Sequence, residues 1–383
     1  MPMEKCLLVT LEYPPQKGGI ANYLANIFSR LPSDKFMVLA PKHKGDREYD
    51  EKATYKILRG SLLSFYIWPR WLPLYLRIKR IVKKNRIKTL CLSHVLPVGY
   101  IAYLLRKNKK FKQRYIVFAH GLDVLKAQEK PRKKKWLIKI LQNASGIVTN
   151  SEYTRGLIRE LGIPDSKILV VYPCPAVRPP KTTVETYDIL SKYGLSNKRV
   201  ILSVGRLVKR KGVDKVIEAL PKLFEQFKDI MYVIVGDGPE IEALGKRVQE
   251  LNLQNIVRFV GEVSDEELIK FYTISELFIM PSRQIGSDVE GFGIAYLEAN
   301  LFGLPVIGGN SGGVPEAILH ERTGLLVNPE DIEQIYGAMR DLLSNKDWAQ
   351  QLGENGRVRA ERDFQWRKET EKLRRYFGGH TYG

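Results

Sequence analysis

Short apolar runs alternate with amphipathic stretches along the whole chain, and this alternation predicts repeated βαβ units with parallel strands. In the N-terminal half the runs predict five strands, at residues 5–13, 36–40, 87–94, 114–120 and 144–151. In the C-terminal half they predict six, at residues 199–206, 230–238, 256–263, 276–282, 305–310 and 324–328. The pattern therefore predicts an α/β protein with two parallel sheets.

A proline-rich stretch separates the two halves. Residues 170–183 hold four prolines, which is typical of a stiff connector. We therefore predict one Rossmann-like domain at residues 1–178 and a second at 184–365, followed by a final amphipathic helix over residues 364–377. Ligands of open parallel sheets bind at the carboxyl ends of the strands, so we expect the functional residues in the loops that follow strands.

Composition agrees with a two-domain globular protein. The chain has 383 residues, of which 44% are hydrophobic and 27% charged. Its three cysteines are far apart, which indicates neither a disulfide framework nor a zinc site and favours a reducing, cytosolic environment. The N-terminus lacks the apolar core of a signal peptide, and no apolar run reaches the length of about 18 residues that a membrane-spanning helix needs.

The positive charge is concentrated in the N-terminal half. Residues 1–180 hold 35 Lys and Arg against 12 Asp and Glu, a net charge of +23, whereas residues 181–383 hold 27 against 30. Such asymmetry predicts that the first domain faces a polyanion, either a nucleic acid or an anionic membrane. The sequence contains no zinc-finger, RRM or KH pattern, which disfavours a nucleic-acid partner.

Two loops have the composition of diphosphate-binding sites. Gly18 and Gly19 follow the first strand and open a helix, whose free N–H groups can bind a phosphate. Arg206 and Lys211 follow the first strand of the second half, where an arginine fork and a lysine ammonium can bind a diphosphate together. Because the chain has no D-x-D motif for a bridging metal, we expect these cations to neutralise the diphosphate without one.

The stretch "SDVEGFGIAYLEA" (287–299) carries two carboxylates at the start of a predicted helix. An ionised carboxylate accepts hydrogen bonds from a vicinal diol, so Glu290 and Glu298 are candidate sugar-binding residues. Gly291, Phe292 and Gly293 lie between them, and the N–H groups at this helix start can bind another part of the same ligand. A Glu298 that simply faces solvent is the competing interpretation.

Residues 61–88 combine aromatic, apolar and basic side chains at helical spacing. This composition is typical of a helix that lies on an anionic bilayer, although part of its apolar stripe has to pack on the sheet. The candidate membrane or acceptor residues are Trp68, Trp71, Tyr75, Arg77, Arg80, Lys83 and Lys84.

Taken together, these motifs resemble those of the retaining glycosyltransferases of family 4, which have the GT-B architecture. The resemblance covers nearly the whole chain and includes "FAHGLD", "GRLVKRKG", "VGDGP", the Glu290-x7-Glu298 spacing, "SGGVPE" and the late "FQW". It implies two Rossmann-like domains that face each other across a cleft, with the C-terminal helix (366–383) crossing back to the N-terminal domain.

The resemblance also implies a role for each motif residue. Gly19 is similar to the glycine whose N–H contacts the donor diphosphate, and His120 to the histidine beside the transferred sugar. Arg206 and Lys211 resemble the diphosphate clamp. The remaining donor-binding positions are Glu290 for the sugar, Glu298 for the ribose, and Glu262 with Val263 for the nucleobase.

By this resemblance the chain transfers a hexose with retention of configuration. The motifs are most similar to those of bacterial GDP-mannose-dependent mannosyltransferases that act on lipids such as phosphatidylinositol. UDP-glucose and UDP-N-acetylglucosamine enzymes share nearly all of them, and a GT-B epimerase or phosphorylase and a basic nucleic-acid-binding protein are further alternatives. We expect a lipid-linked acceptor, a peripheral position on the cytoplasmic face of the cell membrane, and no cofactor besides the nucleotide-sugar donor.

Overall fold

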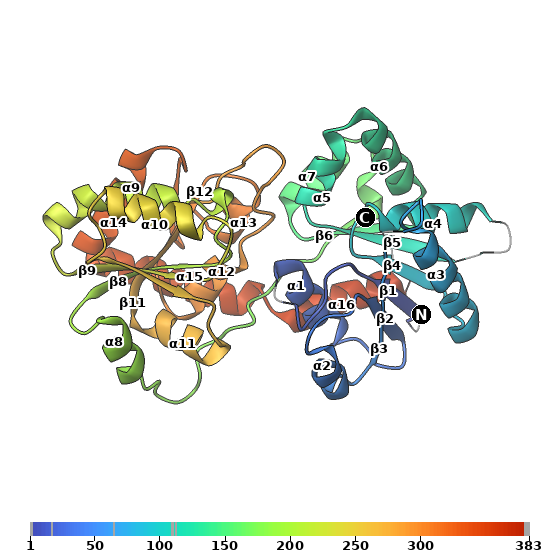
Figure 1. The fold of residues 1–383 in the computed structure, drawn as a ribbon, viewed down its shortest axis with the longest axis horizontal. Coiled ribbons are helices and arrows are strands. Elements are labelled where there is room, and N and C mark those ends of the chain that lie inside the picture. The colour runs from blue at the N-terminus through green and yellow to red at the C-terminus, as the bar shows by residue number, and fades with distance from the viewer. Residues whose placement is uncertain (1–2, 17, 64–65, 109–110, 112, 379–383) are drawn as a thin grey trace. The chain divides into compact units, whose positions relative to one another are not determined.

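The computed structural model describes residues 3–16, 18–63, 66–108, 111 and 113–378. The chain divides into two units, one made of residues 1–173 and 366–383 and the other of residues 174–365. The chain thus enters the first unit twice, once at each end (Figure 1).

In its described residues, the first unit contains a seven-stranded parallel sheet in the order β3-β2-β1-β4-β5-β6-β7. Its strands are β1 (Cys6–Val9), β2 (Phe36–Ala40), β3 (Lys56–Arg59), β4 (Thr89–Leu92), β5 (Arg114–Ala119), β6 (Gly146–Thr149) and β7 (Ile168–Val170). Its helices are α1 (Gly19–Phe28), α2 (Asp46–Lys52), α3 (Leu72–Asn85), α4 (Val98–Lys107), α5 (Leu122–Gln128), α6 (Pro131–Asn143), α7 (Glu152–Arg159) and α16 (Trp366–Phe377), with a short η1 (Asp165–Lys167).

The second unit contains a six-stranded parallel sheet in the order β10-β9-β8-β11-β12-β13. Its strands are β8 (Arg199–Val204), β9 (Ile230–Val235), β10 (Val257–Gly261), β11 (Ser275–Met280), β12 (Val306–Gly309) and β13 (Leu325–Val327). Its helices are α8 (Tyr187–Tyr193), α9 (Val213–Gln226), α10 (Ile241–Glu250), α11 (Asp265–Ile274), α12 (Ile294–Leu301), α13 (Val314–Ala317), α14 (Ile332–Ser344) and α15 (Lys346–Asp363), with a short η2 (Lys209–Lys211).

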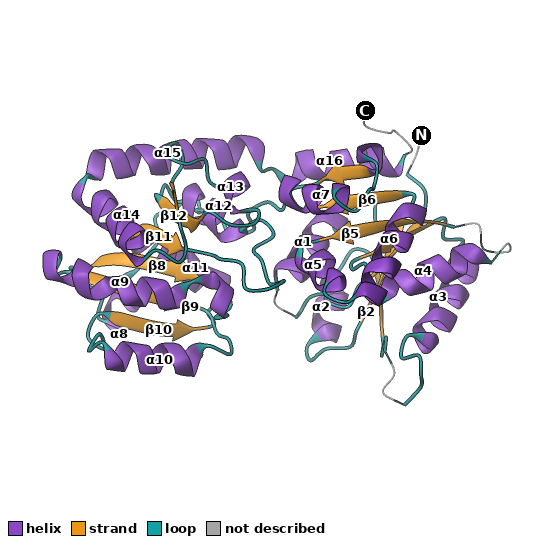
Figure 2. Cartoon of the chain, turned by 90° about the horizontal axis from the view of Figure 1, so that it is seen from above, coloured by secondary structure: helices purple, strands orange, loops and turns teal. Residues whose placement is uncertain are grey.

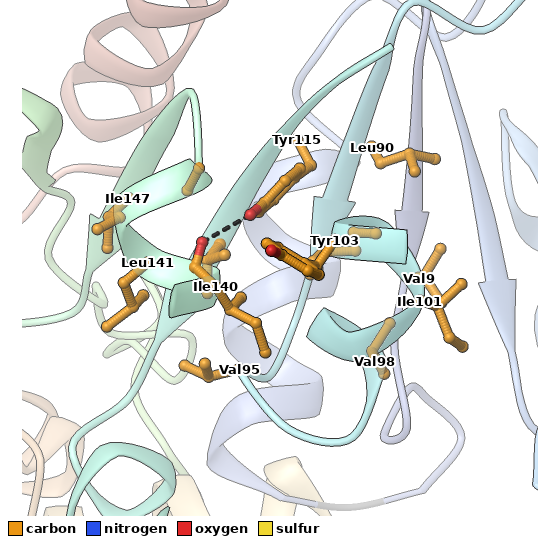
Figure 3. Packing of buried hydrophobic residues seen from close by; sticks show 14 of the residues in the cluster. Val9, Leu90, Val95, Val98, Ile101, Tyr103, Tyr115, Ile140, Leu141 and Ile147 are labelled. Atoms are coloured by element: carbon orange, nitrogen blue, oxygen red, sulfur yellow. Dashed lines mark hydrogen bonds between the residues drawn. The ribbon is translucent and has the colours of Figure 1, made fainter. Parts of the chain in front are cut away.

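Both sheets are buried on both faces, which explains why their strands are almost entirely apolar. In the first unit, alternate residues such as Leu7 and Val9 face the layer of α3, α4 and α6. The hydroxyl of Tyr115 in β5 donates a 2.6 Å hydrogen bond to the carbonyl of Ile140 in α6 and fixes that layer to the sheet (Figure 3). On the opposite face, Phe28 of α1 contacts Phe118 of β5.

Helix α16 completes that opposite face of the first unit. Its Phe377 ring packs on Phe28, with 6.5 Å between the ring centroids. The Tyr376 hydroxyl accepts from the N–H of Ile147 at 3.1 Å and donates to the carbonyl of Lys167 at 2.7 Å. The sequence predicts this helix correctly, and the structure shows the surface that it covers.

In the second unit, α9, α10 and α14 cover one face of the sheet and α8 and α11 lie on the other (Figures 1 and 2). Phe278 of β11 packs between the rings of Tyr272 and Tyr296, at centroid distances of 6.3 and 5.7 Å. All six strands predicted in this half are present. In the first half β3 and β7 are additional to the five predicted strands, because they are short edge strands and β3 carries the polar residues Lys56 and Arg59.

Candidate active site

Strand order locates the place in each sheet where a ligand can bind. In the second unit the order reverses between β8 and β11, and in the first unit between β1 and β4. Loops that follow the strands on either side of such a reversal diverge to opposite faces and leave a crevice at the carboxyl edge. Most of the candidate residues of the sequence follow these four strands or their neighbours.

A glycine allows the loops after β8 and β11 to approach each other closely. Gly212 has φ +75°, and a Cβ there would lie 2.2 Å from the carbonyl oxygen of Pro281. A side chain at this position would therefore separate the two loops. The N–H of Arg283 also donates to the carbonyl of Arg210 at 2.8 Å, so the backbone brings the cations of one loop to the carboxylates of the other.

A cluster of four charged side chains results from this contact. The ammonium of Lys211 and a guanidinium nitrogen of Arg210 each lie 2.5 Å from Oε2 of Glu290. Nε of Arg210 lies 3.0 Å from Oδ1 of Asp288. The cluster holds two cations and two anions, and Arg210 and Asp288 are members that the sequence analysis did not select.

The two cations keep Glu290 ionised. Burial alone would raise the pKa of this carboxyl, but Lys211 and Arg210 outweigh burial and lower the pKa to about 2. Glu290 is therefore an anion throughout the physiological range. In this structure the carboxylate predicted to bind the sugar is paired with the lysine predicted to bind the diphosphate.

Arg206 differs from Lys211 in its surroundings. Its side chain is exposed, and in the described part of the chain it forms no ion pair. The Lys211 side chain is 12% exposed and its stem lies next to Gly205, where a Cβ would be 3.6 Å from Cε. The two cations thus follow the same strand, but only Lys211 has a carboxylate partner.

The glycine loop before α12 is built tightly into the unit. Phe292 is a buried core residue whose ring packs on Phe364 at 5.6 Å, so its ring does not line an open surface. Gly293 is the N-cap of α12 with φ +98°. The "SGGVPE" segment packs on the same loop, because the N–H of Gly313 donates to the Glu290 carbonyl at 2.9 Å.

Glu298 is partly buried, and both of its carboxylate oxygens accept hydrogen bonds from other residues of the same unit. Its Oε1 accepts from the N–H groups of Ala176 and Val177 at 3.3 and 3.4 Å, and Oε2 accepts from the Tyr272 hydroxyl at 3.4 Å. The solvent-facing alternative is therefore excluded. Burial raises the pKa of Glu298 to about 7, although these three donors act in the opposite direction.

The raised pKa of Glu298 predicts a pH-dependent stability difference. A carboxyl whose folded pKa exceeds its unfolded value binds its proton more tightly in the folded state, so stability falls as pH rises from 4.5 to about 7. Glu298→Gln lacks this titration and should become more stable than wild type by about 3 kcal/mol at pH 8, with no advantage at pH 4.5. Denaturant unfolding at both pH values, with the exposed Glu266→Gln as control, measures the difference.

The loop predicted to bind the nucleobase follows β10. Glu262 is exposed and Val263 is partly exposed. The carbonyl of Gly261 accepts from the N–H of Gly236 at 2.8 Å, which fixes the start of this loop beside the end of β9. The loop lies at the same carboxyl edge as the charged cluster, two strands from β8.

In the first unit, Gly18 is the N-cap of α1 and Gly19 is its first residue. A Cβ at Gly19 would meet no atom of the described chain within 4 Å. Packing within the unit therefore does not require a glycine here, whereas the close approach of a ligand to the backbone would.

His120 follows β5 and is a neutral residue in this structure. Burial lowers the pKa of its imidazole to about 4. Its Nε2 lies 3.0 Å from the carbonyl oxygen of Ser93, so the single N–H of the neutral ring is donated to that carbonyl. Nδ1 is then a hydrogen-bond acceptor.

Two neighbours of His120 were not selected from the sequence. Asp123 accepts from the N–H of His120 at 2.9 Å and from the N–H of Val95 at 3.4 Å, which joins the loops after β5 and β4. His94 lies 2.7 Å from Oγ of Ser93, and its ring centroid is 6.0 Å from that of His120.

The predicted membrane segment is only partly helical. Helix α3 begins at Leu72, so Trp68 and Trp71 precede it, and residues 64–65 lie outside the described residues. Trp71 and Tyr75 pack against the core and are half-buried. Arg77 is also turned inward, since its guanidinium donates to the Arg59 carbonyl at 2.8 Å.

Four of the predicted residues are exposed, and together with two exposed leucines of α3 we call them the α3 surface. Trp68 is 88% exposed and Leu76 is 55% exposed. Positions 72, 76, 80, 83 and 84 share one side of the helix, opposite the buried stripe of Leu74, Ile78 and Val82. The α3 surface consists of Trp68, Leu72, Leu76, Arg80, Lys83 and Lys84.

Two features are absent from the described residues, a helix that could cross a bilayer and a group of side chains that could hold a metal ion. None of the described helices is both long and apolar enough to cross a bilayer. The described residues also contain no group of three or more His, Cys, Asp or Glu side chains arranged to hold a metal ion.

Comparison with known proteins identifies the family. Residues 17–174 match the model of Glycosyltransferase Family 4, and residues 188–359 match that of Glycosyl transferases group 1. The chain is similar to the GDP-mannose-dependent alpha-(1-6)-phosphatidylinositol monomannoside mannosyltransferases of Mycolicibacterium smegmatis (32% identity, covering 97% of this chain and 98% of the relative) and Mycobacterium tuberculosis (30%, covering 98% and 99%).

A solved structure agrees with this assignment. HepE from Anabaena, in complex with UDP and glucose, has a TM-score of 0.83 at 17% identity, covering 98% of this chain and 100% of that one. This likeness shows the GT-B fold. The chain is therefore a member of the family 4, group 1 glycosyltransferases, a hexosyltransferase with GT-B architecture.

Proposed function

We propose that this enzyme transfers mannose from GDP-mannose to a lipid or lipid-linked glycan acceptor, with retention of configuration. The observation that carries this proposal is the 32% identity to a GDP-mannose-dependent phosphatidylinositol monomannoside mannosyltransferase over 97% of the chain. The charged residues at the carboxyl edges of both sheets support it, because they supply binding groups for each part of such a donor.

In this proposal the diphosphate binds to Arg206 and Lys211, without a metal ion. The mannose binds to Glu290 and to the N–H groups at the start of α12. The ribose binds to Glu298, and the base lies beside Glu262 and Val263. Activity that survives an excess of EDTA would support the metal-free diphosphate, and loss of activity that Mg²⁺ restores would contradict it.

The reaction would break the bond between the anomeric carbon and the diphosphate oxygen and form a bond from that carbon to an acceptor oxygen. Negative charge grows on the leaving diphosphate, where Arg206 and Lys211 stabilise it. The leaving oxygen takes the proton of the acceptor hydroxyl on the same face of the sugar. In the first unit, Nδ1 of His120 is an acceptor that can receive a hydrogen bond from a hydroxyl group.

A UDP-sugar is the second candidate donor, with glucose or N-acetylglucosamine. The same fold occurs in HepE, whose structure holds UDP and glucose, so the fold does not select the base. Calorimetric titration with GDP, UDP, GDP-mannose and UDP-glucose tests the proposal directly. Tighter binding of UDP and UDP-glucose than of GDP and GDP-mannose would overturn the choice of donor, and product analysis with donor alone would reveal an epimerase.

We further propose that the enzyme is peripheral on an anionic membrane, at its cytoplasmic face, and that the α3 surface makes the contact. Trp68, Leu72 and Leu76 supply apolar groups, and Arg80, Lys83 and Lys84 supply charge at the edge of an amphipathic helix. This surface lies in the N-terminal half, whose net charge of +23 over residues 1–180 exceeds the +20 of the whole chain.

Removing part of the α3 surface should weaken vesicle binding without affecting the donor. Each lysine near an anionic bilayer contributes about 1 kcal/mol, so Lys83→Ala with Lys84→Ala should lower the partition coefficient by about tenfold or more. Flotation with vesicles containing anionic lipid measures this effect. Trp68→Ala removes an exposed apolar group of the α3 surface and should weaken binding as well. Its control is Tyr187→Ala, which removes an exposed aromatic side chain of the other unit. Equal binding of wild type to neutral and anionic vesicles would contradict the proposal.

A further inference from the structure

We propose that Arg210 is a positioning residue for the donor sugar: it holds the Glu290 carboxylate in place when Lys211 turns from Glu290 to the donor diphosphate. This inference rests on the proposed function, since it concerns how the same site receives its donor. It assigns a role to a residue that the motif comparison left without one.

The geometry of Glu290 is the starting point. Both cations contact the same oxygen, Oε2, each at 2.5 Å. The other oxygen of Glu290, Oε1, accepts no hydrogen bond from any described residue. A carboxylate bound through one oxygen can present the other to a sugar hydroxyl without losing its cation.

Lys211 has two prospective anionic partners. In this structure its ammonium is paired with Glu290, and the proposed function requires it at the diphosphate. A lysine ammonium on a flexible four-carbon stem can move between two nearby anions. A diphosphate carries more charge than one carboxylate, so we expect Lys211 to turn to it when the donor binds.

Arg210 is held much more firmly than Lys211. Its Nε is paired with Asp288 at 3.0 Å while another nitrogen of the same planar group contacts Glu290. Its carbonyl accepts from the N–H of Arg283, a buried residue whose guanidinium forms a two-point ion pair with Asp214 at 3.0 and 2.6 Å. Three contacts thus fix Arg210, so it is the cation that remains at Glu290.

The consequence of losing Arg210 follows from burial. The Glu290 side chain is 13% exposed, and a carboxylate at that depth without a cation is costly. If Arg210 were absent, Glu290 would be left without a firmly held cation when Lys211 turns to the diphosphate. Recognition of the sugar should then suffer, while the phosphates would still find Lys211 and Arg206.

The test compares a nucleoside diphosphate with the corresponding nucleotide sugar. In Arg210→Met, affinity for GDP should change by less than about twofold, as for a change that touches no contact. Affinity for GDP-mannose should fall toward that of GDP, and kcat should fall by about 10–100-fold, as for a misplaced binding group. If wild type prefers uridine nucleotides, the same comparison is made with UDP and UDP-glucose.

Two further variants separate positioning from folding. Arg210→Lys should restore part of the sugar-dependent affinity, because it keeps a cation at Glu290. Asp288→Asn should also reduce the sugar-dependent affinity, but by less than Arg210→Met does, because the asparagine variant only loosens the position of Arg210. A merely structural role would lower the binding of GDP and GDP-mannose equally.

The outcomes are distinct. Loss of GDP binding in Arg210→Met would make Arg210 a phosphate ligand and overturn the positioning role, and so would unchanged binding of GDP-mannose with unchanged kcat. A wild-type enzyme that binds neither nucleotide sugar would overturn the proposed function itself, and with it the role of Arg210. That failure appears before any variant is measured.

Discussion

Replacing Lys211 with alanine is expected to lower kcat/KM by about a thousandfold, the scale seen when one group that stabilises growing charge is removed from a transition state. In the proposed reaction Lys211 lies where charge grows on the leaving diphosphate. It is also the more buried of the two candidate phosphate ligands, so solvent screens it less than Arg206. Steady-state kinetics with saturating acceptor measure the loss.

The same turn supplies the control for this variant. Lys209 is exposed and belongs to the same 3-10 turn as Lys211. Lys209→Ala should therefore leave kcat/KM within about twofold of wild type. An Lys211→Ala enzyme that keeps its activity, or a Lys209→Ala enzyme that loses it to the same extent, would show that the clamp has been assigned to the wrong side chain.

The second large effect is expected in the stability of the Glu290→Gln variant. A carboxyl whose folded pKa lies below its unfolded value stabilises the fold above the unfolded pKa, and this contribution is lost as pH falls through the folded pKa. For Glu290 that window runs from pH 4.5 down to about 2. At pH 7 the glutamine variant should therefore be less stable by about 3 kcal/mol.

Denaturant unfolding of wild type and Glu290→Gln at pH 7 and pH 4 tests this expectation. The difference should shrink at the lower pH, where the carboxylate contribution begins to disappear. Asp288→Asn, at the more exposed carboxylate of the same cluster, is a suitable control and should cost less. An equal loss at both pH values would indicate a packing defect and not an electrostatic one.

Much of the fold could be predicted from the sequence because both sheets are buried on both faces. The central strands are apolar runs because both of their faces are buried, and such runs predict all six strands of the second unit. Strands β3 and β7 were missed because edge strands need only a few residues and tolerate polar ones, such as Lys56.

The candidate site could be predicted only as far as its motifs extend. Arg210 lies in the run Lys209-Arg210-Lys211, and no periodicity tells which of three adjacent cations turns inward. Which cation turns inward depends on Gly212, which lets the backbone of Pro281 approach. The loop after β11 then places Asp288 and Glu290 beside Arg210. Such a contact joins residues about 80 positions apart, which local patterns do not encode.

For the same reason, the sequence pattern does not show which side chains of the segment 61–88 are exposed. Arg77 belongs to the basic stripe of the segment 61–88, yet it lies over Gly60 at the sheet edge, where a Cβ would be 1.9 Å from its guanidinium. Trp71 and Tyr75 resemble Trp68 in chemistry but are anchored in the core. Only the packing of α3 on the sheet separates the residues that remain available to a bilayer.

Helix α16 has a practical consequence for anyone who wishes to study the halves of this enzyme separately. A gene fragment that stops after residue 173 would encode every strand of the first sheet but not the helix that shields Phe28. Such a fragment would expose aromatic surface and would be prone to precipitate during expression. An intact N-terminal half requires residues 366–378 to be fused back by a designed linker.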